Sequence, residues 1–240
     1  TDEDLVAAFA GEVTEYTGAI TVTGVADVDN LVTIDAETDG EINYSVIRLW
    51  SGDIFNPTYS IYVNEDKEVE LKDEPTLEEL KAYNTATIGA IRLWGIPASL
   101  EGIAADIFDA FAGTVTAVGG APYSGDLTVS DAEDTVLTAL DLATLGGKTT
   151  GDVIVDNAVE ITGTAAQVTE ALVTAETKVL ASSAKVTLND GADTALTATA
   201  LSAIGRETNG AVTVSNAVEI TGTAAQVTEA LVTAETKVLA

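Results

Sequence analysis

Residues 157–181 read NAVEITGTAAQVTEALVTAETKVLA, and residues 216–240 repeat this stretch without a change at an offset of 59. At that offset, residues 126–156 also align without a gap on residues 185–215. The chain therefore contains two copies of one unit, at 126–184 and 185–240, and the second copy is three residues short. Repetition of this kind favours a stack of similar coils over one unique core.

Each unit divides into two half-units that open with a short run rich in β-branched residues. The four runs are LTV at 127–129, VIV at 153–155, VTL at 186–188 and VTV at 212–214. We expect a strand at each run, followed by a helix-compatible segment. Because parallel strands are naturally joined by helical crossovers, we predict an α/β repeat solenoid of parallel short strands alternating with short helices. A compact doubly wound α/β domain is the alternative.

Helix starts and ends are predicted from capping patterns. Thr164 with Gln167, its copy Thr223 with Gln226, and Ser130 with Glu133 have the capping-box spacing. After the first of these, Ala165, Val168, Ala171 and Leu172 are expected to share one buried helix face. Gly146 and Gly205 stand where a helix C-cap is expected.

The first half of the chain resembles a degenerate version of the same pattern. Residues 4–14 match residues 106–116, and IRLW at 47–50 recurs at 91–94. Residues 51–88 interrupt the pattern and contain Lys67, Lys72 and Lys81. In this stretch we expect a β-hairpin from YSIYV and EVEL, and a short helix from about Pro75.

These patterns predict the organisation of the whole chain. We expect degenerate solenoid coils over 1–50, an inserted hairpin plus short helix over 51–88, a degenerate coil and connector over 89–125, repeat unit 1 over 126–184 and incomplete repeat unit 2 over 185–240. Insertions in repeat proteins map to one face, which is often the functional one.

The composition excludes several function classes. The 240 residues include 39 Asp and Glu against 10 Lys and Arg, and no Cys, His or Met. Thiolate and imidazole metal sites and Ser–His or Cys nucleophiles therefore have no residues to use. A net charge of −29 without a basic patch argues against binding to nucleic acid or to anionic membrane surfaces. The sequence has no run of about 18 consecutive apolar residues, so no membrane-spanning segment is predicted. Because the chain starts at Thr1 without a signal-peptide pattern, we expect a processed product or an internal segment.

The stretches VTVSNAVEITGTAAQVTEAL at 212–231 and VADVDNLVTIDAETDGEI at 25–42 resemble tandem repeats of very long bacterial proteins. These are cyanobacterial-type cell-surface proteins and adhesins, and fibre-like phage or appendage proteins. The resemblance covers 15–45 and 114–240. It implies an extracellular structural or adhesive role and provides no catalytic residues. The segment 51–88 departs from it.

Three acidic clusters are candidate calcium sites, because calcium prefers six to eight oxygen ligands. They are Asp131, Glu133 and Asp134; Asn189, Asp190 and Asp193; and Asp27, Asp29 and Asn30. Helix capping is the favoured interpretation, since none has the spacing of an EF-hand loop. We therefore assign no metal ligands and no cofactor, and leave calcium open.

Aromatic residues provide two further candidate surfaces. Trp50 and Trp94 either form a carbohydrate-stacking pair or close the core at equivalent positions, with Arg48 and Arg92 in ion pairs. The core interpretation is favoured, because Ile-in, Arg-out, Leu-in alternation predicts a strand. The better candidate contact surface is formed by Tyr59, Tyr62 and Tyr83.

The sequence thus predicts a non-enzymatic structural or adhesive segment of a long extracellular surface protein, filament or fibre. The expected location is extracellular, on a cell surface or on a virion or appendage surface. The expected partners are neighbouring copies or repeats of the same protein, with surface glycans as a further candidate. The alternatives are a phage tail-fibre component that binds a host surface, and a polysaccharide-active solenoid enzyme that uses paired carboxylates.

Overall fold

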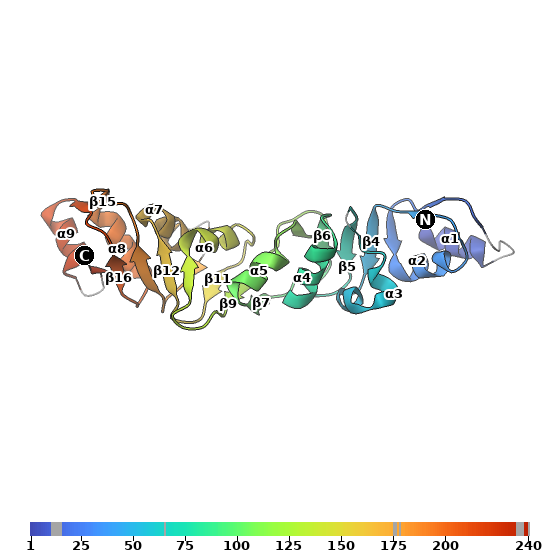
Figure 1. Cartoon of the computed structure of the whole chain (residues 1–240), viewed down its shortest axis with the longest axis horizontal. Helices are drawn as coiled ribbons and strands as arrows, with labels where there is room; N and C mark the ends of the chain where they lie inside the picture. Colours follow the sequence, from blue (N-terminus) through green and yellow to red (C-terminus); the bar gives the residue numbers. More distant parts are fainter. Residues whose placement is uncertain (11–15, 65, 175–176, 178, 234–237, 240) are drawn as a thin grey trace. The chain divides into compact units, whose positions relative to one another are not determined.

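The computed structural model spans residues 1–240, and the structure describes 1–10, 16–64, 66–174, 177, 179–233 and 238–239 (Figure 1). The chain divides into two compact units. The first comprises 1–97 and 108–123, and the second comprises 98–107 and 124–240. The division passes through helix α5 (Ala104–Ala110).

The first unit alternates short strands with short helices. Its elements are α1 (Asp2–Phe9), β1 (Ile20–Thr21), β2 (Val25–Asp27), α2 (Val28–Asp35), β3 (Ile42–Asn43), β4 (Val46–Leu49), the 3₁₀ turn η1 (Ser51–Phe55), α3 (Pro57–Ser60), β5 (Glu68–Leu71), α4 (Leu77–Ala86), β6 (Ile91–Leu93) and β8 (Val115–Ala117).

The second unit has the same kind of alternation. Its elements are β7 (Ser99–Gly102), β9 (Asp126–Val129), β10 (Val136–Thr138), α6 (Ala139–Gly146), β11 (Val153–Val155), β12 (Glu160–Gly163), α7 (Ala165–Val168), the π-helical turn η2 (Thr169–Val173), β13 (Val179–Leu180), β14 (Lys185–Leu188), β15 (Ala195–Thr197), α8 (Ala198–Glu207), β16 (Val212–Val214), β17 (Glu219–Thr221), α9 (Ala224–Leu231) and β18 (Val238–Leu239).

Every pairing between these strands is parallel. The first unit contains the sheets β2-β4-β5-β6-β8 and β1-β3, and the second contains β10-β12-β14-β16-β18, β13-β11-β9-β7 and β15-β17. Paired residues lie between 21 positions apart, as Val25 with Val46, and 27 positions apart, as Ser99 with Asp126. The prediction of an α/β fold with parallel strands and alternating helices is confirmed at this level.

The four predicted strand runs are all strands, in β9, β11, β14 and β16. The capping box predicted at Ser130 and Glu133 is wrong, because a turn at Asp134, with φ of 62°, leads into strand β10 and no helix begins there. Helix α6 begins after β10, where the Thr138 hydroxyl accepts from the Asp141 N–H at 3.1 Å.

The other predicted helix signals have mixed outcomes. The capping boxes at Thr164 and Thr223 are confirmed, and the predicted face of Ala165, Val168, Ala171 and Leu172 is buried. The C-cap predictions at two glycines are wrong. Gly146 is the last residue of α6, where a Cβ would meet the backbone of Thr177, and Gly205 lies inside α8. Close packing rather than helix termination thus explains the glycine at 146.

The predicted hairpin within 51–88 is also wrong. Residues 57–60 form helix α3, and β5 pairs in parallel with β4 on one side and β6 on the other. EVEL is therefore a central strand of the sheet and not part of a projecting insertion. Residue 65, in the expected turn, lies outside the described residues. The predicted short helix is confirmed as α4, which begins at a capping box of Thr76 and Glu79.

A Thr-x-Gly motif precedes a strand at four positions, two in each unit. In each case the buried threonine hydroxyl donates to a backbone carbonyl near the start of the neighbouring strand and accepts from the glycine N–H. The pairs are Thr38 with Tyr16 O (2.5 Å), Thr87 with Lys67 O (2.6 Å), Thr149 with Gly125 O (2.6 Å) and Thr208 with Ala184 O. The glycines are Gly40, Gly89, Gly151 and Gly210.

The glycine of this motif is needed for close approach. A Cβ on Gly89 would overlap the Lys67 carbonyl, and one on Gly210 would overlap the Ala184 carbonyl. The motif therefore draws one strand start against the next while both buried polar groups remain satisfied.

Thr87→Val should lower the free energy of unfolding by about 1–3 kcal/mol, because the Lys67 carbonyl and the Gly89 N–H both lose a buried partner. Urea unfolding monitored by circular dichroism measures this. Thr85→Val is the matched control, since its hydroxyl is exposed and donates only within α4. Equal losses in the two variants would contradict a special role for the motif.

Candidate functional site: the Trp50–Lys72–Trp94 row

The ends of β4, β5 and β6 place three side chains in one row on the outer face of the sheet. Leu49, Leu71 and Leu93 are in register and buried. The hydrogen bonds from Lys72 N to Leu49 O and from Trp94 N to Leu71 O, both 3.0 Å, extend that register by one residue. Because side chains alternate along a strand, the next residues point outward and form the row Trp50, Lys72 and Trp94.

Both indoles of this row are exposed. Trp50 is 51% and Trp94 is 56% accessible. The expectation that they close the core is therefore wrong: the Leu residues that precede them fill the core, and the alternation turns the indoles out. The Lys72 ammonium lies 5.4 Å from the Trp50 ring centre, and the Arg48 guanidinium lies 5.1 Å from the Trp94 ring centre, which orients both rings.

A second row, of alternating charge, lies two residues earlier on the same strands and on the same face. Arg48, Glu70 and Arg92 are in register. Arg48 donates twice to Glu70, at 2.7 and 3.0 Å, and Arg92 donates twice to Glu68, at 2.7 and 3.1 Å. The expected ion pairs of both arginines are confirmed.

The two rows border a shallow hollow of about 310 Å³. It is lined by Asp27, Arg48, Lys72 and Trp94. Lys72 pairs with Asp27 at 2.7 Å, and the Trp94 indole N–H donates to Glu70 at 3.3 Å. The hollow thus combines an exposed aromatic face with charged groups that balance one another, which suits a polar, uncharged ligand more than an ion.

The predicted tyrosine contact surface is wrong for two of its three members. Tyr62 and Tyr83 are buried, and only Tyr59 is partly exposed. The Tyr62 hydroxyl donates to Asp35 at 2.8 Å, and the Tyr83 hydroxyl donates to the Trp50 carbonyl at 3.0 Å. These residues are core side chains whose hydroxyls reach polar partners.

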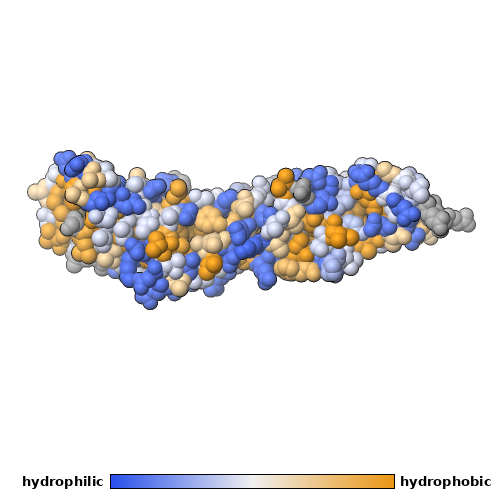
Figure 2. All heavy atoms as spheres, viewed as in Figure 1, coloured by the Kyte–Doolittle hydropathy of each residue, from blue (hydrophilic) through white to orange (hydrophobic). Residues whose placement is uncertain are grey.

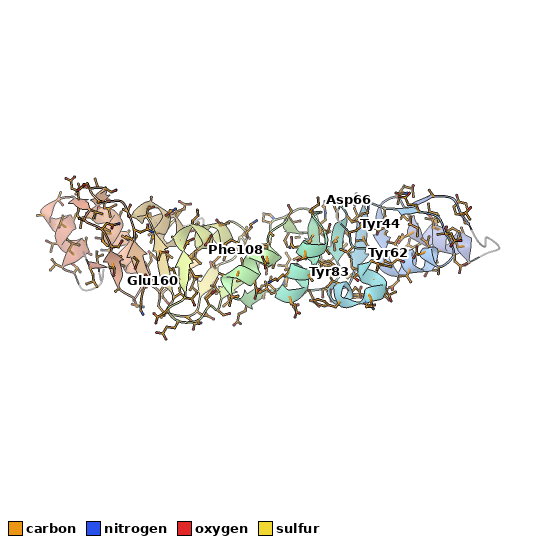
Figure 3. The ribbon with its side chains drawn as sticks, viewed as in Figure 1. Tyr44, Tyr62, Asp66, Tyr83, Phe108 and Glu160 are labelled. Carbon is orange, nitrogen blue, oxygen red and sulfur yellow. The ribbon has the colours of Figure 1, made fainter. Side chains whose placement is uncertain are left out.

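A fourth tyrosine, Tyr44, joins this buried group. Its hydroxyl donates to the Tyr62 carbonyl at 2.6 Å, and Figure 3 places the two residues close together in the first unit. Burial raises the pKa of Tyr44 to about 12. Burial and the hydrogen bond to Asp35 also raise the pKa of Tyr62, and burial raises that of Tyr83.

One aspartate of each acidic cluster caps a backbone N–H group, and Asp27 and Asp134 form ion pairs with lysines. Asp131 accepts from the Ala104 N–H at 2.7 Å and Asp190 from the Ala165 N–H at 2.8 Å. Asp27 accepts from the Asp29 N–H at 3.3 Å at the start of α2. Within the described ranges, no group of three or more acidic side chains is gathered in a way that could hold a metal ion.

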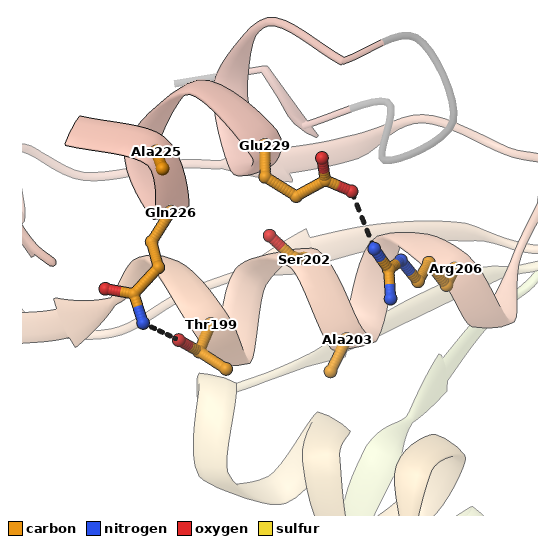
Figure 4. Close-up of a pocket in the computed structure, with 7 residues that line it drawn as sticks. All are labelled: Thr199, Ser202, Ala203, Arg206, Ala225, Gln226 and Glu229. Atoms are coloured by element: carbon orange, nitrogen blue, oxygen red, sulfur yellow. Dashed lines mark hydrogen bonds and ion pairs between the residues drawn. The ribbon is translucent and has the colours of Figure 1, made fainter. Parts of the chain in front are cut away.

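A second hollow, of about 370 Å³, lies in the second unit between α8 and α9 (Figure 4). Arg206 pairs with Glu229 across it at 2.6 Å, and the Gln226 amide donates to Thr199 at 3.2 Å. The hydrogen bond from Arg206 lowers the pKa of Glu229. Small side chains, Ser202, Ala203 and Ala225, form the rest of its lining, so it is a gap between two helices joined by their polar side chains.

Comparison with known proteins identifies no relative: no family, curated protein or solved structure matches this chain. In the part of the chain that the structure describes, no helix is both long and apolar enough to cross a bilayer.

The free energy of unfolding should fall by about 2 kcal/mol between pH 10 and 12 through Tyr44 alone. The pKa of Tyr44 is higher in the folded than in the unfolded chain, so its contribution is complete below the unfolded value near 10 and is lost as pH rises through the folded value. Tyr44→Phe lacks this ionisation, so the stability difference between the two proteins should shrink over that range. Urea unfolding at pH 9 to 12 measures it, and parallel curves would contradict it.

Proposed function

We propose that each unit is a stretch of α/β solenoid, and that the chain is a non-enzymatic structural and adhesive segment of a long extracellular surface protein, filament or fibre. The observation that carries this proposal is the recurrence of one set of contacts: parallel pairing at 21 to 27 positions, with the Thr-x-Gly hydrogen bonds at the strand starts. Each coil then uses its neighbour to complete its core, as solenoid repeats do.

The exact sequence repeat supports the same proposal. Sequence-identical coils can stack without a unique partner, because each presents to the next the surface that it receives from the previous one. Such a body lengthens by adding copies, which is what a filament or a surface layer requires.

The Trp50–Lys72–Trp94 row is the proposed adhesive surface, and surface glycans are its proposed ligand. Two strand spacings, or about 9.6 Å, separate the backbone positions of Trp50 and Trp94, so one extended chain of sugar rings has two aromatic side chains to contact. The flanking Arg48, Glu70 and Asp27 provide hydrogen-bond groups for sugar hydroxyls. The ion pairs Arg48–Glu70 and Lys72–Asp27 leave no excess charge among these groups. Trp and Arg are also enriched among the residues that contribute most to binding at protein–protein interfaces.

A second copy of residues 126–184 inserted between residues 184 and 185 should unfold together with its neighbours. In a solenoid the added unit gains two interfaces, so the midpoint and the m-value should both rise in a single transition. Urea unfolding followed by circular dichroism tests this. Two separate transitions, with the original midpoint unchanged, would show an independent domain and contradict the solenoid.

Trp94→Ala and Trp50→Ala should each weaken glycan binding about tenfold, which corresponds to about 1.4 kcal/mol. Affinity electrophoresis in gels containing hydroxyethylcellulose, xylan or laminarin measures retardation of the intact chain. Phe55→Ala is the matched control, because Phe55 is an equally exposed aromatic residue outside the row. Absence of retardation in all three gels, or retardation that survives both Trp substitutions, would contradict an adhesive role for the row.

A further inference from the structure

The repeated segment occupies two different environments in the second unit. In the copy at 157–181, Val159, Ile161 and Val168 are fully buried. In the copy at 216–240, the corresponding Val218, Ile220 and Val227 are partly exposed. Figure 2 shows hydrophobic residues on the surface over the C-terminal elements. Since the sequence is identical, only the neighbouring segments account for the difference.

The structure identifies what covers the first copy. Strand β14 pairs with β12, where Lys185 N–H donates to the Val159 carbonyl and Asn189 N–H to the Gly163 carbonyl, both at 2.9 Å. Helix α8 then packs against η2. The covering segment is therefore the strand, turn and helix that begin the next repeat unit.

An aspartate completes this junction. Asp190, which is buried, accepts from the Ala165 N–H at the start of α7. The same contact occurs where β9 pairs with β7, between Asp131 and Ala104, and where β5 pairs with β4, between Asp73 and the Ser51 N–H at 2.8 Å. In all three junctions, the aspartate lies two residues after the end of one strand, and it accepts from the backbone N–H of the residue two positions after the end of the paired strand.

The second copy presents the same groups without a covering segment. Among the described residues, β17 pairs only with β15, and nothing occupies the place of Asp190 at the exposed Ala224. The carbonyls of Val218 and Gly222 correspond to those that Lys185 and Asn189 contact in the first copy.

We infer that the face formed by β17 and α9 is a docking surface for one further copy of residues 182–215. The incoming strand would pair in parallel with β17, its Asp190 would cap Ala224, and its helix would cover α9. Charge complementarity supports this occupant. Lys185 pairs with Asp134 at 2.5 Å across the first junction, and the residue that corresponds to Asp134 at the second face is Asp193, which has the same backbone geometry, φ of 63° against 62°.

This inference rests on the proposed solenoid, and a cis extension tests it. A second copy of residues 182–215 is joined after Ala240, and amide hydrogen exchange is measured at Ala224. Docking should slow exchange at this amide at least tenfold and raise the melting temperature. The extension carrying Asp190→Ala in the appended copy should lose the protection at Ala224 while it retains part of the gain in melting temperature, because the strand pairing remains.

An appended segment of the same composition in scrambled order is the control. Unchanged exchange at Ala224 in the intact extension, or equal protection with the scrambled one, overturns the inference. The insertion between residues 184 and 185 separates the two proposals. If the protein with the insertion unfolds in a single transition but the extension leaves the Ala224 amide unprotected, the proposed solenoid is supported and the proposed docking surface is contradicted.

Discussion

The parallel, in-register pairing of the strands is the constraint on which the rest of this structure depends, and in four of the described strand pairs a hydrogen bond from a buried threonine hydroxyl to the carbonyl beside the neighbouring strand anchors it. Parallel strands cannot be joined by a tight turn, so each strand is reached through a long connection whose length varies here from one strand pair to the next. A connection of variable length needs a local anchor to begin the next strand at the correct residue. Thr87 with Gly89 and Thr208 with Gly210 supply this anchor. The threonine hydroxyl binds the carbonyl before the neighbouring strand, and the missing Cβ of the glycine allows the two backbones to approach closely.

Once the register is set, both faces of the sheet follow from it. Ile47, Val69 and Ile91 meet inside, and Arg48, Glu70 and Arg92 meet outside. Like charges directly opposite one another on neighbouring strands are destabilising, so the middle strand must carry the opposite charge. The same alignment produces the Trp50–Lys72–Trp94 row, in which a cation separates two aromatic rings. The proposed adhesive surface thus follows directly from the parallel strand pairing.

This requirement also explains why sequence comparison within the chain missed the middle strand. VELK at 69–72 lies between IRLW at 47–50 and IRLW at 91–94 and pairs in register with both. It shares their aliphatic positions, but Glu70 and Lys72 replace Arg and Trp because the neighbours demand complementary side chains. Sequence similarity reveals a repeat only where positions that face one another on paired strands can hold the same residue. The Thr-x-Gly pattern at 38, 87, 149 and 208 was visible in the sequence, but the same spacing at Thr144 and Gly146 lies in helix α6, so the pattern alone would not have distinguished the four strand starts.

The sequence by itself determined the local elements of this protein: the β-branched strands, the Thr-capped helices at Thr164, Thr223 and Thr76, and the parallel α/β class. These follow from side-chain shape and from hydrogen bonds between residues a few positions apart. Only the tertiary structure decided that Trp50 and Trp94 are exposed, that Tyr62 and Tyr83 are buried, and that EVEL is a central strand. The identical segments at 157–181 and 216–240 give the reason, because the burial of a residue depends on the segment that packs against it. That segment lies elsewhere in the chain, as β14 does relative to the β12 strand with which it pairs.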